Sequence, residues 1–131
     1  MKSLLTILAM TLSLSVLGQN VMVFNGKGIV EFKSETFRPG KAASLLCSDC
    51  DQARQHFQKA QRIRTWNIIL SNISFAEIVL GVINLEDNTA VGVLHASIGG
   101  GVLALIANRE KRIDKEVQLG VSAFNRCRLL N

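Results

Sequence analysis

Two ionisable side chains interrupt the apolar sequence in the second half of this 131-residue chain. Glu77 lies within NISFAEIVLGVIN (72–84), and His95 lies within GVLHASIGGG (92–101). A lone carboxylate in apolar surroundings is costly and tends to take up a proton, unless a partner shares its charge. An imidazole can be that partner. Glu77 and His95 are therefore the first candidates for a functional site.

The sequence between these two residues predicts that they meet. INLEDNTA (83–90) is rich in acids and Asn, so we expect a turn of about six residues between two antiparallel helices. Glu77 and His95 lie equally far from the centre of this turn, near residue 86, and therefore at the same depth. The same register places Asn72, with Ser71 or Ser74, opposite Gly99, Gly100 and Gly101. Small residues there would let the helices pack closely.

The Glu77–His95 pair has two interpretations within a membrane. We interpret it as a polar clasp, a side-chain contact that holds two helices, or two hairpins of an oligomer, together. The alternative is a proton relay or a substrate path, because ionisable groups within a membrane are candidates for such roles. Two spans do not enclose a path alone, so this alternative requires an oligomer. A third hypothesis places the helices outside lipid, buried in a partner.

Three cysteines offer a second kind of chemistry. Cys47 and Cys50 form CSDC, which has the C-x-x-C spacing of redox and metal sites, and Cys127 follows much later. A thiol–disulfide enzyme would need this motif within a βαβ unit, and zinc would need four ligands; the sequence indicates neither. The hairpin register instead predicts a structural Cys47–Cys127 disulfide. We expect no catalytic residues, no metal and no cofactor, and hence no enzyme.

The charge pattern indicates which part of the chain faces lipid. No Lys or Arg occurs between Arg64 and Arg109, and all 15 basic residues lie outside that window. Residues 90–107 contain no charged side chain except a protonated His95, and a helix of this length spans about 27 Å, nearly the hydrocarbon thickness of a bilayer. We predict apolar spans at about residues 66–85 and 90–107.

The remaining segments predict a small domain around this hairpin. Residues 1–18 have the charged start, apolar middle and small residues of a secretory signal peptide. Residues 19–40 contain two short apolar runs around Asn25-Gly26, the pattern of a β-hairpin followed by a loop. Residues 41–131 form the helical hairpin domain. The predicted fold class is mainly α: an antiparallel transmembrane helical hairpin with amphipathic helical arms and a short N-terminal β-hairpin.

Basic residues border the two apolar spans. Arg62 and Arg64 precede the first span, Arg109 and Arg112 follow the second, and Trp66 lies beside them. A collar of cations with an interfacial Trp is typical of contact with lipid headgroups, so the bilayer is the predicted partner. Nucleic acid is not expected, because the aromatic residues that would stack on bases are missing.

The predicted signal peptide and the distribution of basic residues predict opposite membrane topologies. If the signal peptide is cleaved, both basic arms lie outside the cytoplasm and the acidic turn points inward, which inverts the positive-inside pattern. Three explanations are open. The signal peptide prediction is wrong, or the hairpin inserts from the periplasmic side into another membrane, or helix packing overrides charge.

The order of these features resembles a family of small exported two-span membrane proteins of Bacteroidetes-type bacteria, for which no activity is established. The matching pieces are VFNGKGI, KAASLL, ARQHFQKAQ, GVLHASIGGGVLALIANREKR and RIDKEVQLGVSAFN. Phe124-Asn125 stands where Tyr-Asn is usual in that family, and the first span is unusually polar. The resemblance implies membrane residence, and it carries no catalytic residues over to this chain.

The sequence as a whole predicts an exported protein of a bacterial cell envelope membrane, with the inner membrane preferred to the outer. Its leading predicted role is structural or in protein interaction, with a homo-oligomer through the Gly99–Gly101 face as one expected assembly. An oligomeric transport or sensing component that uses Glu77 and His95 is the alternative. A soluble secreted helical protein is the further alternative.

Overall fold

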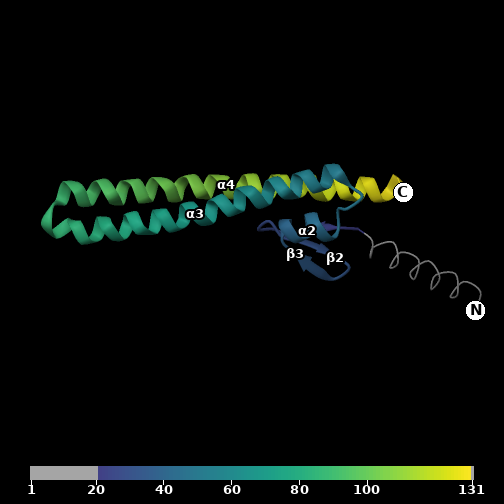
Figure 1. The fold of residues 1–131 in the computed structure, drawn as a ribbon, viewed down its shortest axis with the longest axis horizontal. Coiled ribbons are helices and arrows are strands. Elements are labelled where there is room, and N and C mark those ends of the chain that lie inside the picture. Colours follow the sequence, from purple (N-terminus) through teal and green to yellow (C-terminus); the bar gives the residue numbers. More distant parts are fainter. Residues whose placement is uncertain (1–20, 131) are drawn as a thin grey trace, which may run out of the picture.

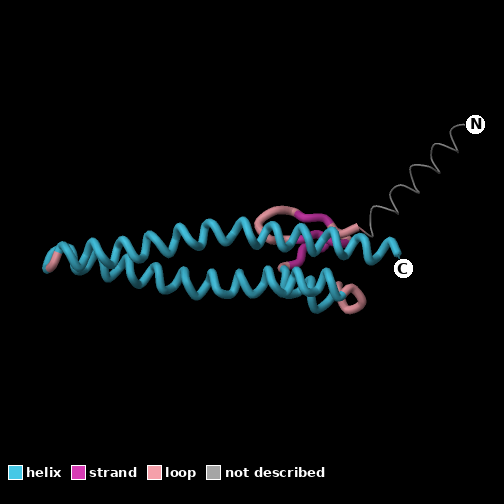
Figure 2. Tube along the Cα trace, turned by 90° about the horizontal axis from the view of Figure 1, so that it is seen from above, coloured by secondary structure: helices cyan, strands magenta, loops and turns pink. Residues whose placement is uncertain are grey.

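The computed structural model describes residues 21–130, and the signal peptide predicted for residues 1–18 lies outside them. Two long antiparallel helices pack side by side, and a three-stranded sheet and a short helix pack against one end of this pair (Figure 1). In the view from above, the sheet and the short helix again lie at that same end (Figure 2). The predicted mainly helical fold, with a small β element ahead of the helices, is confirmed.

The sheet contains one strand more than the predicted β-hairpin. β1 (Val23–Phe24) pairs with β2 (Val30–Phe32), and β2 pairs with β3 (Glu35–Phe37). Both pairings are antiparallel, so the sheet is a meander in the order β1-β2-β3.

The turns of this sheet differ from the single tight turn predicted at Asn25-Gly26. The β1–β2 connection is a loop over residues 25–29, in which three consecutive residues have positive φ. The two-residue turn lies instead at Lys33-Ser34, with φ of 52° and 65°. Residues other than glycine bear a cost of about 1 kcal/mol each in this region. The pairing of β2 with β3 thus imposes a conformation that the local sequence does not favour.

The short helix α2 (Pro39–Leu45) begins with a proline, whose fixed φ suits the first turn of a helix and whose missing N–H is not needed there. Ala42 and Ala43 are buried, and α2 packs against α3. The backbone N–H of Gly40 donates to Oε1 of Gln61 on α3 at 3.2 Å. These contacts attach α2 to α3.

The long helices α3 (Asp51–Asp87) and α4 (Thr89–Leu130) run without a break through both predicted spans. Only Asn88 separates them, so the turn is much shorter than the turn of about six residues that was expected. Asn88 is extended, and its Oδ1 accepts a hydrogen bond from the backbone N–H of Val91 at 3.3 Å. A single capping residue is enough to reverse the chain, because it ends one helix and starts the next.

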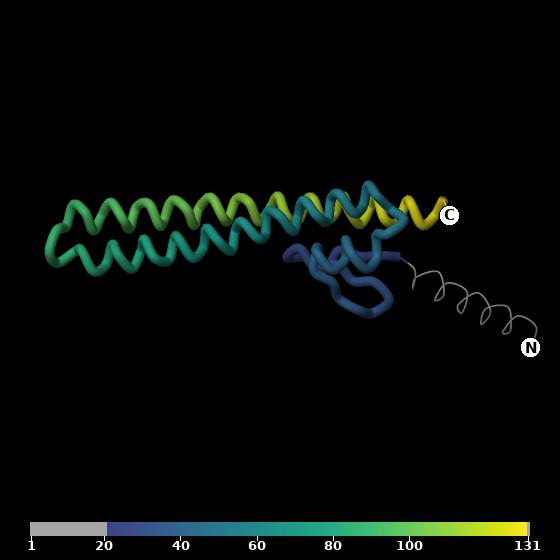
Figure 3. The backbone as a smooth tube through the Cα atoms, in the orientation of Figure 1, coloured from purple at the N-terminus to yellow at the C-terminus, as the bar shows by residue number. Residues whose placement is uncertain are grey.

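The buried core is confined to one end of the molecule. We call this end the head; it comprises residues 21–64, which contain the sheet, α2 and the start of α3, and residues 109–130 of α4. Phe32 and Phe124 meet edge to face there, with ring centroids 5.4 Å apart. The side chain of Asn125 bonds the backbone N–H and C=O of Met22, both at 2.8 Å. The described chain therefore begins beside the last turns of α4 (Figure 3).

The rest of the helical pair, residues 66–107, has no such core, and we call it the apolar hairpin. Both helices contain a window of mean hydropathy 1.9, of which only 11% is buried. Large apolar side chains are exposed along both helices, such as Phe75 at 70% and Leu105 at 61%. The core helix of a soluble protein is mostly buried. Two helices of this chain are thus long and apolar enough to cross a membrane.

Candidate functional site

A repeat of seven residues brings α3 and α4 together along their whole length. The buried residues in this repeat are Ala53, Ala60, Asn67, Ser74 and Gly81 on α3, and Gly92, Gly99, Ile113 and Gly120 on α4. We call this stripe of positions the seam. Its spacing is that of a coiled coil. Most of its residues are small, so the two backbones approach closely, as in helix pairs within membranes.

The glycines of the seam in the apolar hairpin leave no room for a side chain. A Cβ on Gly81 would lie 2.8 Å from the backbone nitrogen of Ala96, and one on Gly92 would lie 2.9 Å from the backbone oxygen of Gly81. A Cβ on Gly99 would lie 2.8 Å from the backbone oxygen of Ser74. The Ser74 hydroxyl donates to the Gly99 carbonyl at 2.7 Å. A Cβ on Gly81 or Gly92 would meet backbone atoms that cannot rotate aside, and one on Gly99 would also lie 2.6 Å from Cγ1 of Ile78, so glycine is required at all three positions.

Of the residues predicted to pack across this interface, only Gly99 and Ser74 do so. Asn72, Gly100 and Gly101 are exposed, and a Cβ on either of these two glycines would meet nothing within 4 Å. Their predicted packing against the other helix was wrong. Successive residues of a helix point about 100° apart, so only one of three adjacent glycines can face α3.

The structure brings Glu77 and His95 together, as the position of the turn predicts. Nδ1 of His95 lies 2.6 Å from Oε2 of Glu77. The side chain of His95 is 30% exposed and that of Glu77 is 25% exposed, so the pair lies at the edge of the helix interface and not within it. An imidazole N–H can donate a hydrogen bond to a carboxylate oxygen. This geometry suits a clasp between the helices.

A second pair of the same residue types, which was not predicted, lies in the head. Nδ1 of His56 is 2.8 Å from Oε2 of Glu116, and Nζ of Lys59 is 2.6 Å from Oε1 of the same carboxylate. Burial alone would raise the pKa of Glu116, but the hydrogen bonds and charges of Lys59 and His56 outweigh burial and lower that pKa below its ordinary value. Glu116 is therefore ionised at neutral pH and holds two residues of α3.

The two pairs occupy equivalent positions of the seven-residue repeat, with the residue types exchanged between the helices. Three heptads separate His56 from Glu77 on α3, and three heptads separate His95 from Glu116 on α4. Each of these residues follows a seam residue by three positions. The repeat is the signal that could have revealed the second pair, because it continues beyond the apolar spans into both helical arms.

Asn67 lies in the seam where the head meets the apolar hairpin. Its Nδ2 donates to Oε1 of Glu110 at 3.0 Å, and the residue is only 4% exposed. Its Oδ1 is buried and has no hydrogen-bond partner in the part of the chain that the structure describes. A polar residue at a buried coiled-coil position fixes the alignment of the helices at some cost in stability. Asn67 accordingly sets the register at this border.

The predicted interfacial residues do not form one uniform ring. Arg109 and Arg112 lie on one side, where both line a cavity that α3 also helps to form. The guanidinium of Arg64 lies close to the β1–β2 loop of the head. Arg62 and Trp66 are exposed, Trp66 at 52%. Residues of the collar that lie at similar depth therefore have different surroundings.

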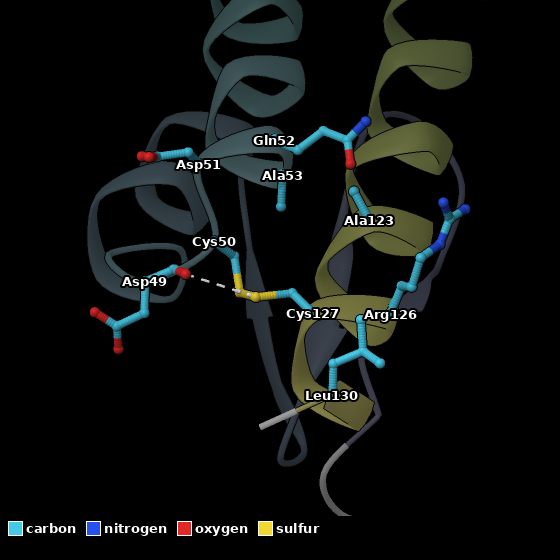
Figure 4. Close-up of a pocket in the computed structure, with 9 residues that line it drawn as sticks. All are labelled: Asp49, Cys50, Asp51, Gln52, Ala53, Ala123, Arg126, Cys127 and Leu130. Atoms are coloured by element: carbon cyan, nitrogen blue, oxygen red, sulfur yellow. Dashed lines mark hydrogen bonds between the residues drawn. A yellow bond between two sulfur atoms is a disulfide. The ribbon is translucent and has the colours of Figure 1, made fainter.

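The disulfide is not the one predicted. Cys50 is bonded to Cys127, and Cys47 is a free, buried thiol. Figure 4 shows the bond joining the start of α3 to the last turns of α4. The predicted Cys47–Cys127 bond was wrong. Cys47 lies in the connection after α2, whereas Cys50 is the cap residue of α3 and faces Cys127, which continues the seven-residue repeat of the seam on α4.

The surroundings of the cysteines do not favour redox chemistry. A cavity of about 440 Å³ adjoins the disulfide (Figure 4). Sγ of Cys127 lies 3.6 Å from the carbonyl oxygen of Asp49, which is a contact and not a hydrogen bond, because a disulfide sulfur carries no proton. Burial raises the pKa of Cys47 to about 11, with the charge of Arg54 opposing the rise. Cys47 is thus a thiol at neutral pH and a poor nucleophile.

Within residues 21–130, no group of three or more His, Cys, Asp or Glu side chains is placed to hold a metal ion. No family model, curated protein or solved structure matches the chain. The resemblance to exported two-span proteins of Bacteroidetes-type bacteria stays a prediction.

Proposed function

We propose that this chain is a membrane protein of the cell envelope, with the apolar hairpin in the bilayer and the head in water, and that its role is structural or in protein interaction. The exposure of large apolar side chains along residues 66–107 is the observation that carries this proposal. Full burial of such a side chain is worth about 1.5–3 kcal/mol, and each of these, being 38–70% exposed, gains a corresponding part of that on leaving water. Insertion into lipid would remove all of these side chains from water together.

The dimensions of the apolar hairpin support the same position. Residues 66–85 of α3 rise about 30 Å, which is the thickness of the hydrocarbon core. Trp66 and the cations lie at one end of this segment, and Glu86 and Asp87 lie at the other. The polar ends would then meet water or headgroups on both sides, and Glu77 and His95 would lie between.

The seam supports a structural role over transport by a single copy. Gly81, Gly92 and Gly99 contact backbone atoms of the opposite helix, so no path runs between the two helices. The Glu77–His95 clasp adds about 0.6–2 kcal/mol to the helix pairing within lipid. The Cys50–Cys127 disulfide joins the two helices at the opposite end of the pair, in the head. The result is a stiff hairpin that presents a small head at the membrane surface, as a scaffold or docking protein requires.

Disulfides persist in oxidising compartments, so the Cys50–Cys127 bond supports an exported head. The basic collar adjoins the head and would lie on the same side. Of the three explanations for the inverted charge pattern, we favour the one in which helix packing overrides charge. A fusion of alkaline phosphatase after residue 131, which is active only outside the cytoplasm, is expected to be active. An inactive fusion that is full-length would overturn this topology.

Alkaline carbonate extraction tests membrane insertion. The full chain is expected to stay with the membrane pellet, and its release into the supernatant would favour a soluble secreted protein. Ile98→Arg places a charge in the middle of the second span, at a cost of about 2.5–3.5 kcal/mol, and is expected to increase release. The control is Leu45→Arg on α2 of the head, where the replaced side chain is 65% exposed and Arg should change nothing.

Transport or sensing by an oligomer is the second candidate function. The partial exposure of Glu77 and His95 favours it, because a second copy could cover their outer edge and complete a path. Proteoliposomes that contain a pH-sensitive dye would report proton movement. A flux that is lost in Glu77→Gln supports this candidate, and the absence of flux in the wild-type chain removes it.

A further inference from the structure

Two adjoining cavities lie between α3 and α4 where the head meets the apolar hairpin. One, of about 310 Å³, is lined by Lys59, Ile63, Arg112, Lys115 and Glu116. The other, of about 490 Å³, is lined by Ile63, Leu105, Asn108, Arg109 and Arg112. Because Ile63 and Arg112 line both, the two cavities form one concave surface, which we call the basic groove.

The basic groove has an excess of positive charge. Its cations are Lys59, Arg109, Arg112 and Lys115. Its acid, Glu116, is already bound to Lys59 and His56. None of the other three cations forms a salt bridge with any residue between 21 and 130. Two guanidinium groups and an ammonium group therefore line the groove without an anionic partner among the residues that the structure describes.

The groove is also amphipathic along its length. Leu105 is apolar, lies toward the apolar hairpin and is 61% exposed, whereas Ile63 lies in the head and packs against its core. Arg112 and Lys115 lie further toward the head on the same face of α4. The helix rises about 15 Å from Leu105 to Lys115, which covers the change from hydrocarbon to headgroup in a bilayer. A ligand that fits this surface has an apolar end and an anionic end.

We infer that the basic groove binds an anionic glycerophospholipid, with the phosphate against Arg109, Arg112 and Lys115 and an acyl chain along Leu105. The planar guanidinium group offers paired N–H donors that match the oxygens of a phosphate. Free phosphate would use only the basic end and leave Leu105 exposed, so the apolar end selects a lipid. This inference rests on the proposed membrane location of the apolar hairpin.

Trp66 allows a direct test, because it is the one Trp of the whole sequence and lies three residues after Ile63. The full chain is reconstituted into phosphatidylcholine vesicles that contain, at equal mole fraction, either brominated phosphatidylglycerol or brominated phosphatidylcholine. Bromine quenches Trp fluorescence only at short range. We expect stronger quenching by the anionic lipid, and we expect the preference to persist at about 1 M salt, where diffuse attraction between exposed charges is screened within about 3 Å.

A pair of double variants separates a site from general surface charge. Arg109→Gln with Arg112→Gln removes two cations of the groove, and is expected to lower the preference for the anionic lipid roughly tenfold to thirtyfold. Arg62→Gln with Lys111→Gln removes the same charge at similar depth, from exposed residues that line neither cavity. This control should keep the preference that persists at high salt.

Each outcome decides between the proposals. Equal loss in both double variants, or a preference that vanishes at high salt, overturns the site and leaves only a diffuse collar. Equal quenching by both lipids in the wild-type chain overturns the site but retains the membrane location. No quenching by either lipid overturns the membrane location itself. Addition of inorganic phosphate that abolishes the preference would show that the groove recognises phosphate alone and not a lipid.

Discussion

The same substitution is expected to have opposite effects at three consecutive glycines of α4. Gly99 faces α3 in the seam, whereas Gly100 and Gly101 face outward. Replacement of each by Ala adds one methyl group to the same helix at almost the same depth. The three variants therefore differ only in what the new methyl group meets.

The expected magnitudes follow from the contacts. A Cβ on Gly99 would lie 2.8 Å from the Ser74 backbone oxygen, about 0.6 Å short of the 3.4 Å at which ordinary contacts begin. Overpacking of this kind costs about 1–3 kcal/mol, and weakening of the Ser74–Gly99 hydrogen bond adds about 1 kcal/mol. Gly100→Ala and Gly101→Ala should instead gain about 0.5–1 kcal/mol from helix propensity. Gly99→Ala should thus be less stable than either control by roughly 2–4 kcal/mol.

Unfolding of the detergent-solubilised chain by increasing mole fractions of SDS measures these differences. Trp66 fluorescence reports the tertiary structure near the collar, and circular dichroism reports the helices. Gly99→Ala should unfold at a lower SDS fraction than the wild type, and the two control variants at the same or a higher fraction. Equal midpoints for all three variants would refute the close approach of the helices, and a less stable Gly100→Ala would mean that the outer face is itself packed.

Three further predictions concern the head. Because the pKa of Glu116 is lowered in the folded chain, its ion pairs contribute stability above the ordinary value of 4.5 and lose it as the pH falls below that value. Glu116→Gln should therefore cost about 1–2 kcal/mol near neutral pH and less in acid, measured as unfolding midpoints across pH; a constant difference would contradict the ion pairs. Ser34→Gly should stabilise the chain by up to about 1 kcal/mol by relieving a positive φ of 65°, and a loss of stability would contradict the β2–β3 turn. Cys127→Ser should lower the free energy of unfolding by up to about 4.5 kcal/mol, the chain-entropy value for a bond across 77 residues, and should make unfolding insensitive to reductant. Cys47→Ser is the control and should keep that sensitivity; if it loses it, the pairing is wrong.

The overall plan of this protein can be predicted from its amino-acid sequence. Hydropathy and the absence of basic residues between Arg64 and Arg109 predicted two antiparallel apolar helices, which the structure contains. The position of the turn predicted the contact of Glu77 with His95. These features depend on spacing along a single helix and on one reversal, so they can be counted from the chain. A wrong turn length does not change which residues face each other as long as the centre of the turn is right.

Features that lie far from the turn, or that depend on rotation about a helix, could not be predicted in this way. Cys127 is bonded to Cys50 and not to Cys47, because Cys50 caps α3 whereas Cys47 lies in the connection after α2. A count of residues from the turn cannot distinguish the two cysteines. Gly99 packs and its two neighbours do not, because about 100° of rotation separates successive side chains. The basic groove exists only because residues of α3 and α4, far apart in the sequence, lie side by side at the border of the head. Charges that form a uniform collar in the sequence become, in three dimensions, one concave surface with unpaired cations and an apolar end.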